Sequence, residues 1–159
     1  MQTFTTINPA TNKELKSYQL NSEKEVEDIL NEVGKTYASY KNTSFSERSQ
    51  MMHKAADLLE ERKQTYAEHM TLEMGKTLSS AIAEVEKCAW VCRYYADNAK
   101  AFLEDEIVET DAQKSLICYR PQGPVLAVMP WNYPFWQVLR FAAPALMAGN
   151  VAVLKHASN

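Results

Sequence analysis

The stretch from Pro121 to Asn159 limits the possible folds of this chain more than any other part. Its 39 residues carry two formal charges, Arg140 and Lys155, whereas every Asp and Glu lies at or before Asp111. Segments this apolar are typical of parallel strands and their crossover helices, which are buried on most sides. Two strands and one helix cannot bury their own apolar surface, so we expect further structure to cover this stretch.

Within this stretch, the order of the apolar runs predicts one parallel βαβ unit. A short β-branched run at 125–128 is followed by a long apolar segment, 135–148, and then by a second short run at 151–154. Two parallel strands in one sheet need a crossover connection, which is usually a helix. The sequence therefore predicts an α/β fold whose parallel part lies at the C-terminal end of the chain.

The part of the chain that precedes this unit is expected to be mainly helical. Helices are predicted to begin at Ser22 and at Ser44, because each of these serines has a Glu three residues later, as in a capping box. The second of these helices is expected to continue to Met74, and a third to cover residues 77–103. Near the N-terminus, a short strand is predicted at 14–20.

The turn between the first strand and the helix of the βαβ unit carries the strongest chemical signal. Pro130 and Pro134 flank Trp131, Asn132 and Tyr133, and each proline disfavours helix for the residue before it. Ligands of open parallel sheets bind beyond the carboxyl ends of the strands, so Asn132 is expected to face a binding crevice. Its neutral amide could stabilise an oxyanion there. The alternative is that Asn132 only caps the helix or forms an Asx turn.

Several spaced motifs resemble the NAD(P)-dependent aldehyde dehydrogenase superfamily. In chain order, these motifs are Asn8-Pro9-Ala10-Thr11, Glu47-Arg48, Glu73-Met74-Gly75-Lys76, Pro130-Trp131-Asn132-Tyr133-Pro134, Ala143-Pro144-Ala145-Leu146, Ala148-Gly149-Asn150 and Val153-Leu154-Lys155. Within the superfamily, the bacterial succinate-semialdehyde dehydrogenases are the most similar, through Trp136-Gln137-Val138-Leu139-Arg140 and Lys155-His156-Ala157. Because the motifs agree in order, the resemblance covers essentially the whole chain.

The resemblance implies a truncated cofactor-binding domain in three parts. Residues 1–111 form its helical N-terminal part, and residues 112–122 belong to the arm through which members of the family oligomerise, with a strand at 115–119. Residues 123–159 form the first βαβ unit of its Rossmann-like parallel sheet. The nucleophilic Cys, the general-base Glu and the Gly-rich phosphate turn of the family have no match in this sequence. We therefore expect the N-terminal portion of an enzyme, without turnover of its own.

The resemblance also implies a cofactor site for NADP or NAD. The matching residues follow the two strand ends and are Met129, Pro130, Trp131, Lys155 and Ser158. Lys155 matches the lysine that contacts the adenosine ribose, although a solvated lysine at a strand end is an equally simple interpretation. Ser158 stands where NAD-preferring relatives often carry Glu, so no carboxylate is expected to repel a 2′-phosphate.

The substrate implied by the resemblance is a small aldehyde, with succinate semialdehyde expected. Asn132 matches the residue whose amide holds the oxyanion. Tyr133 and Trp136 match residues that line the aldehyde tunnel. For Trp136, packing in the core is the alternative interpretation. Arg140 is the only charge in an apolar helix, and burial of an unpaired guanidinium is costly. It therefore either reaches a carboxylate from the missing part of the protein or binds an anionic substrate, as its planar fork would allow.

Charge and composition exclude several other classes of protein. The net charge of −3 and the pI near 5.7 provide no basic surface for nucleic acid or an anionic membrane. Without a recognisable signal peptide or apolar span, and with an odd number of cysteines, the chain is expected to be cytoplasmic. Cys88 and Cys92 lack further ligands at zinc spacing, so they are interpreted as core thiols and no metal site is predicted.

Two hypotheses from different classes follow from the sequence. The first is an oxidoreductase chain whose parent protein oxidises succinate semialdehyde or a similar aldehyde and forms a homo-oligomer. The second is a non-catalytic fragment that associates only with itself or with a complete subunit, because its βαβ unit leaves a large apolar face uncovered.

Overall fold

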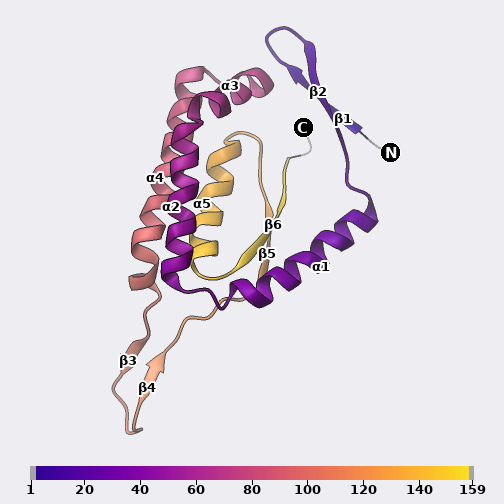
Figure 1. Cartoon of the computed structure of the whole chain (residues 1–159). Helices are drawn as coiled ribbons and strands as arrows, with labels where there is room; N and C mark the ends of the chain where they lie inside the picture. Colours follow the sequence, from indigo (N-terminus) through magenta and orange to yellow (C-terminus); the bar gives the residue numbers. More distant parts are fainter. Residues whose placement is uncertain (1–2, 158–159) are drawn as a thin grey trace.

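A computed structural model describes residues 3–157 as a mixed α/β chain (Figure 1). The elements, in order, are β1 (Thr3–Asn8), β2 (Lys13–Gln19), α1 (Glu23–Tyr40), α2 (Phe45–Glu61), α3 (Lys63–Met74), α4 (Leu78–Phe102), β3 (Glu106–Val108), β4 (Ser115–Ile117), β5 (Pro124–Val128), α5 (Pro134–Met147) and β6 (Val151–Lys155). Within these residues, no helix has the length and apolar character that crossing a bilayer requires.

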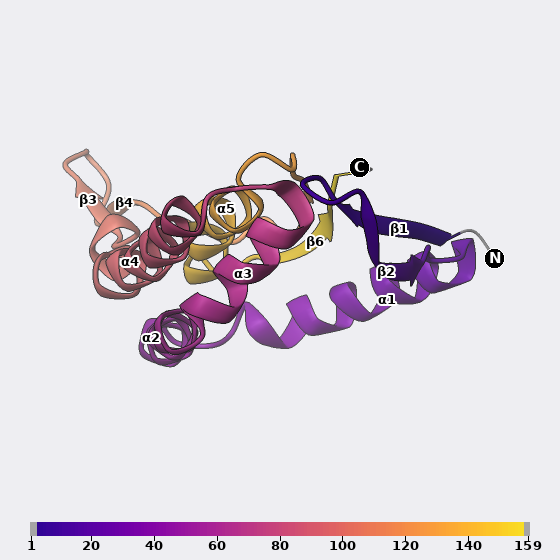
Figure 2. The same ribbon diagram turned by 90° about the horizontal axis from the view of Figure 1, so that it is seen from above.

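The predicted parallel βαβ unit is confirmed. β5 and β6 pair in parallel, from Pro124 opposite Val151 to Val128 opposite Lys155, and α5 forms the crossover. The strand pair lies between α5 and α1 in both ribbon views (Figures 1 and 2). At the start of both strands, Asn150 Oδ1 accepts hydrogen bonds from the backbone N–H groups of residues 122 and 123, at 2.7 and 3.1 Å. The side-chain amide of Asn150 thus ties the starts of the two strands together.

Both predicted capping boxes are present. Ser22 Oγ accepts the backbone N–H of Glu25 at 3.3 Å, and the Glu25 carboxylate accepts the backbone N–H of Ser22 at 2.7 Å. Ser44 and Glu47 form the same reciprocal pair at 3.2 and 2.7 Å. These local bonds satisfy backbone donors that a helix start otherwise leaves free, which explains why the two starts are readable from sequence.

The expectation of one helix from Ser44 to Met74 is wrong, because the helix divides at Arg62 into α2 and α3. Arg62 has φ −106° and ψ 12°, although helical hydrogen bonds continue on both sides of it. The bend keeps α3 on α4 and brings it to β1, where Ala67 and Met70 are buried. No proline or glycine marks the bend, and the helices on both sides of it pack against α4.

Strand β1 was not predicted from the sequence. It pairs with the expected strand, β2, as an antiparallel hairpin. Its turn explains the Asn8-Pro9-Ala10-Thr11 motif. Asn8 Oδ1 accepts hydrogen bonds from the backbone N–H groups of Ala10 and Thr11, at 2.9 and 3.3 Å, as in an Asx turn. Pro9 packs against Gly75, the left-handed C-cap of α3 with φ +73°. The hairpin is thereby attached to the end of α3.

α4 is the central element of the core. Its Val85, Cys88, Ala89 and Cys92 are fully buried among small and apolar residues of α2, α3 and α5, so the interpretation of the two cysteines as core thiols is confirmed. Among the residues that the structure describes, no group of three or more metal-ligating side chains comes together.

A short antiparallel hairpin, β3–β4, follows α4 and projects from the body of the chain (Figure 1). The expected strand at 115–119 is seen as β4, over 115–117. β3 precedes residue 112, so the projecting segment begins earlier than the arm segment that the sequence outlined. Ile107, in β3, is 82% exposed, which is unusual for an isoleucine and marks an uncovered apolar surface.

A buried arginine, Arg48, holds the C-terminal end of α5. Its Nε donates to the carbonyl oxygen of Met147 at 2.9 Å, and its Nη1 donates to that of Thr43 at 2.5 Å. The guanidinium also lies over the ring of Phe45, 4.6 Å from its centroid. These bonds join α5, α2 and the turn before α2, which explains the presence of Arg48 in the Glu47-Arg48 motif.

We predict that Arg48→Met lowers the free energy of unfolding by about 2 to 4 kcal/mol, because buried carbonyl groups lose a charged donor. Urea denaturation followed by circular dichroism measures the change. Lys54→Met, at an exposed position of α2, is the matched control and should change the free energy by less than about 0.5 kcal/mol. Equal effects of the two substitutions would contradict the prediction.

The buried thiols predict a loss of stability at high pH. Burial raises the pKa of Cys88 to about 12 and that of Cys92 to about 11, from an ordinary value of 9.0. Above pH 9 the unfolded chain releases these two protons while the folded chain retains them, so the free energy of unfolding falls as the pH rises further. The double variant Cys88→Ala and Cys92→Ala should show a smaller fall between pH 9 and pH 11 in urea denaturation. An unchanged slope would show that the thiols do not contribute.

Candidate functional site

The two strand ends that the sequence singled out lie side by side at one edge of the parallel pair. Beyond the last residue of β5, the backbone N–H of Met129 donates to the carbonyl oxygen of Lys155 at 3.0 Å. The ladder therefore continues to the first of the predicted cofactor residues, with Pro130 and Trp131 following directly. Ser158, also predicted for this site, lies outside the described residues.

The turn between β5 and α5 presents its side chains to solvent. Trp131, Asn132 and Tyr133 are all exposed, and the N-cap position of α5 is occupied by Tyr133. No side chain of the turn caps the helix, so the alternative in which Asn132 serves as the cap of α5 is not realised. The Asn132 amide stands at the strand-end edge, one residue before the helix.

The N-terminus of α5 is capped by a residue that sequence reasoning missed. Glu84, from α4, accepts the backbone N–H groups of Phe135 and Trp136 on its Oε1, both at 3.0 Å. Its other oxygen pairs with Lys76, and Glu84 itself is only 4% exposed. Two sequence signals were available. Glu84 is a charged residue on the otherwise apolar face of α4, and the predicted helix after Pro134 has no capping residue of its own.

This cap changes which part of the unit could receive an anion. A free helix N-terminus attracts phosphate, because its N–H groups point outward and the helix dipole is positive there. At α5 the carboxylate of Glu84 already occupies that position. The strand ends and the turn from Met129 to Asn132 lie next to this occupied helix start.

Two aromatic side chains of the predicted substrate set lie next to lysines. Lys76 Nζ is 3.9 Å from the ring centroid of Tyr133, and Lys87 Nζ is 4.1 Å from that of Trp136. Trp136 is partly buried and packs against the core, as its alternative interpretation expected. Tyr133 is 47% exposed. The two rings therefore differ in how much surface they leave for a substrate.

Arg140 is not buried in this chain, so its guanidinium carries no burial cost here. The side chain is exposed, and its Nη2 donates to Gln137 Oε1 at 2.9 Å, one helical turn earlier on α5. Within the described residues the guanidinium has no carboxylate partner. The bond to Gln137 uses one N–H and leaves others free to receive an anion.

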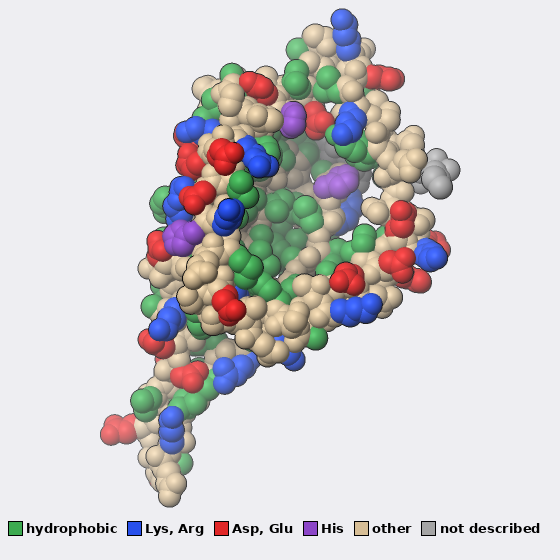
Figure 3. All heavy atoms as spheres, viewed as in Figure 1, with side chains coloured by type: hydrophobic (Ala, Val, Ile, Leu, Met, Phe, Trp, Pro, Cys, Tyr) green, Lys and Arg blue, Asp and Glu red, His purple; other side chains and the backbone are tan. Residues whose placement is uncertain are grey.

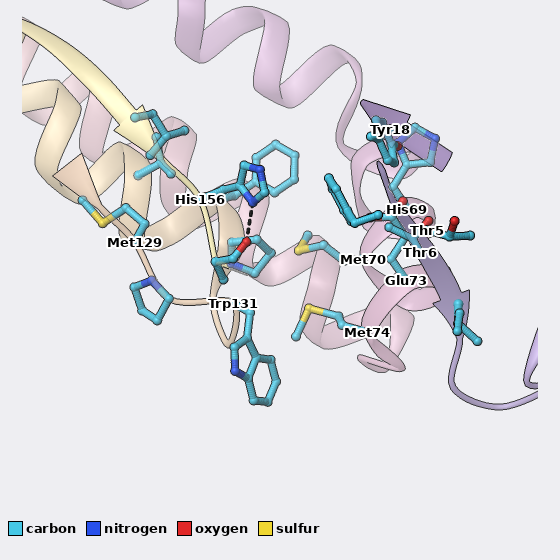
Figure 4. Close-up of a pocket in the computed structure, with 18 of the residues that line it drawn as sticks. Thr5, Thr6, Tyr18, His69, Met70, Glu73, Met74, Met129, Trp131 and His156 are labelled. Carbon is cyan, nitrogen blue, oxygen red and sulfur yellow. Dashed lines mark hydrogen bonds between the residues drawn. The ribbon is translucent and has the colours of Figure 1, made fainter. Parts of the chain in front are cut away.

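An open groove of about 730 Å³ joins this edge to the N-terminal hairpin. Figure 4 shows Met129, Trp131 and His156 on one side of it, and Met70, Met74 and Tyr18 on the other. In the space-filling view, this face of the chain is hollowed, and hydrophobic side chains lie in the hollow (Figure 3). Most residues that line the groove are apolar, and its polar lining consists of Thr5, Thr6, Gln19, His69, Glu73 and His156.

The hairpin was not foreseen as part of this groove. Phe4 of β1 stacks on Tyr18 of β2 with ring centroids 5.2 Å apart, and its ring lies 5.6 Å from that of His156. The only available sequence signal was a pair of aromatic residues in an otherwise polar segment. Because the pairing brings residue 4 opposite residue 18, the aromatic surface forms only once β1 and β2 are in register.

Comparison with known proteins agrees with this arrangement. The sequence matches the Aldehyde dehydrogenase family over residues 1–159. It is 56% identical over 154 residues to the probable succinate-semialdehyde dehydrogenase [NADP(+)] of Synechocystis sp., and 51% identical over 157 residues to the succinate-semialdehyde dehydrogenase [NADP(+)] of Mycobacterium leprae. Each alignment covers 97% of this chain and 34% of the relative, so the chain spans about one third of the length of these curated relatives.

The structural comparison gives the same result. The crystal structure of succinic semialdehyde dehydrogenase from Streptococcus pyogenes, in complex with NADP+ as the cofactor, superimposes with a TM-score of 0.92 at 36% identity. The match covers 98% of this chain and 34% of that one. The chain therefore belongs to the aldehyde dehydrogenase family, of which it represents the N-terminal portion.

Proposed function

We propose that the protein carrying this chain oxidises succinate semialdehyde, or a similar small aldehyde acid, to the carboxylic acid through a thioester, with NADP or NAD as the oxidant. The observation that carries the proposal is the ladder bond from Met129 to Lys155, which places the cofactor-matching strand end, the Asn132 turn and a cation at one edge. The relatives named above for this activity support it.

The residues at this edge fit a nicotinamide cofactor. Trp131 and Leu154 are 53% and 50% exposed and offer flat apolar surface, while Lys155 offers a donor for ribose hydroxyls or a 2′-phosphate. The sequence from 112 to 159 contains no Asp or Glu, so neither strand end supplies a carboxylate that would repel a 2′-phosphate. When bound, the cofactor accepts hydride from the substrate carbon, and on this basis NADP is proposed alongside NAD.

In this proposal Asn132 supplies one hydrogen bond to the oxyanion that forms when a thiolate adds to the aldehyde. A neutral amide suits this role, because the negative charge must form and then collapse without trapping the intermediate. Cys88 and Cys92 are buried in α4, where a ligand cannot reach them. Cys118 directly follows β4 of the projecting hairpin. The nucleophilic thiol and the general base are thus proposed to come from sequence outside these 159 residues.

The substrate proposal rests on Arg140. Its exposed guanidinium lies two turns along α5 from the Asn132 turn, and Gln137 holds one of its N–H groups. A free guanidinium edge can bind the distal carboxylate of an aldehyde acid by two parallel hydrogen bonds. Tyr133 and Trp136 are proposed to line the path of the carbon chain between these two groups.

We also propose that β5 and β6 are part of a larger Rossmann-like sheet and that the protein is a cytoplasmic homo-oligomer. Leu126 and Val128 of β5 are 67% and 65% exposed, and Leu154 of β6 is 50% exposed. Strands of parallel sheets bury such residues on both faces, so further structure is expected to cover them. The hairpin β3–β4 is proposed as part of the oligomerisation arm.

The test of the substrate proposal uses the protein translated from the full reading frame that contains this sequence. Arg140→Ala should raise the KM for succinate semialdehyde by roughly 10- to 100-fold, because a charged hydrogen bond contributes about 1.5 to 3 kcal/mol. The KM for butanal, which has no carboxylate, should stay within about twofold. Steady-state formation of NADPH measures both. If Arg140→Ala raises the KM for both aldehydes equally, Arg140 does not bind the substrate carboxylate. If the wild-type protein oxidises neither aldehyde, the proposed activity is contradicted.

A second candidate function, that of a non-catalytic self-associating module, is favoured by the exposed apolar strands. We predict that the 159-residue chain associates with itself and that Leu126→Lys, in β5, lowers the association more than Ile107→Lys, in the hairpin. Light scattering coupled to size-exclusion chromatography gives the mass of each variant. Leu30→Lys is the control, because Leu30 is 54% exposed but lies on α1. A monomeric wild type at high concentration would contradict this prediction.

A further inference from the structure

The helix that follows the Asn132 turn begins without a cap of its own. Tyr133, at the N-cap, contributes no side-chain acceptor, and the first turn contains no acidic residue. Pro134 has no N–H, so the first donors that need a partner are those of Phe135 and Trp136. Both donate to Glu84 Oε1 at 3.0 Å, so one side chain of α4 fixes the start of α5.

Glu84 is itself held in place by a second charged residue. Lys76, in the turn between α3 and α4, pairs with Glu84 Oε2, and the two side chains are 9% and 2% exposed. The same ammonium group lies over the ring of Tyr133, 3.9 Å from its centroid. The pair thus contacts the residue directly after Asn132 as well as the two N–H groups beyond it.

These contacts leave the Asn132 turn attached at both of its ends. Before the turn, Met129 is bonded to Lys155 of β6 at 3.0 Å. After it, Phe135 is bonded to Glu84. Residues 130–134 lie between these two points, and two of the five are prolines with a fixed φ. A segment this short and stiff takes its position from its two attachments.

We infer that Glu84, held by Lys76, is a positioning residue for Asn132, and this inference rests on the proposed function. Glu84 does not touch the substrate. It fixes the first turn of α5 and thereby the direction in which the Asn132 amide meets the developing oxyanion. An oxyanion donor must be set in advance, and a displacement of about 1 Å can lower the rate by on the order of 100-fold.

The electrostatics of the pair explain why Lys76 is needed as well. A lone carboxylate at this position would disfavour an oxyanion forming close to it, and it would be costly to bury. The ammonium group of Lys76 neutralises Glu84 while leaving Oε1 free to accept the two backbone N–H groups. The α5 N-terminus is thus fixed without adding net negative charge beside the turn.

The decisive comparison uses two variants that leave no buried charge unpaired. In a Lys76→Met background, Glu84→Gln keeps an acceptor for the two N–H groups, whereas Glu84→Leu removes it. In the enzyme from the full reading frame, we expect the Leu variant to have a kcat roughly 10- to 100-fold below that of the Gln variant. The KM for NADP should agree within about twofold in the two variants, because the strand ends are unchanged. Equal kcat values would overturn the inference.

Two further variants separate positioning from a loss of folding. Glu84→Asp keeps the charge and Lys76 but is one methylene shorter, so it should lower kcat even where the Leu variant does not fold, and a wild-type kcat would count against the inference. Lys87→Met removes the neighbouring lysine over Trp136 without touching Glu84 and should leave kcat within about threefold. A loss in Lys87→Met equal to that in Glu84→Asp would show a general effect of packing and overturn the inference.

A spectroscopic readout keeps this inference distinct from the proposed activity. In the ¹⁵N-labelled 159-residue chain, the Gln variant should keep an ordered Asn132 side-chain amide and slow exchange of the Phe135 and Trp136 amides. The Leu variant should lose both. If the wild-type enzyme oxidises no aldehyde, the proposed function fails and this spectrum alone decides whether Glu84 positions Asn132. Identical spectra of the two variants would overturn the inference.

Discussion

The structure depends on two buried charges that meet the two ends of one helix. Glu84 and Arg48 are the buried charged residues of the described chain, and both bind backbone groups of α5. Their signs match the helix dipole, with the carboxylate at the N-terminus and the guanidinium at the C-terminus. Because α5 carries only Arg140 as a charge of its own, its position between α4 and the strand pair is set by residues that other helices supply.

This division explains which parts of the fold were readable from sequence. The starts of α1 and α2 follow from Ser22 and Ser44, whose partners lie three residues away. The caps of α5 lie 51 and 99 residues away in the chain, so no local pattern could reveal them. The bend at Arg62 and the strand β1 were also missed, because no proline or glycine marks the bend and β1 lies in a mainly polar segment.

The candidate site divides in the same way. The two prolines predicted a turn at Asn132 before a helix, and the apolar runs predicted that Met129 and Lys155 would lie at the ends of neighbouring strands. Neither pattern could show that Arg140 is exposed and bonded to Gln137, or that Phe4 comes to lie beside His156. The chemical roles of these residues came from resemblance, because a spacing of residue types specifies position better than reactivity.

The occupation of the α5 N-terminus has a consequence for how such a βαβ unit can bind a ligand. In many dinucleotide-binding units, the N–H groups at the start of the first crossover helix receive the phosphates. Here those groups are bonded to Glu84, and displacing it would leave Lys76 unpaired in a site where its side chain is 9% exposed. The N–H groups at the start of α5 are therefore not available to a phosphate in this arrangement. The start of α5, held by Glu84, instead fixes the end of the turn that carries Asn132.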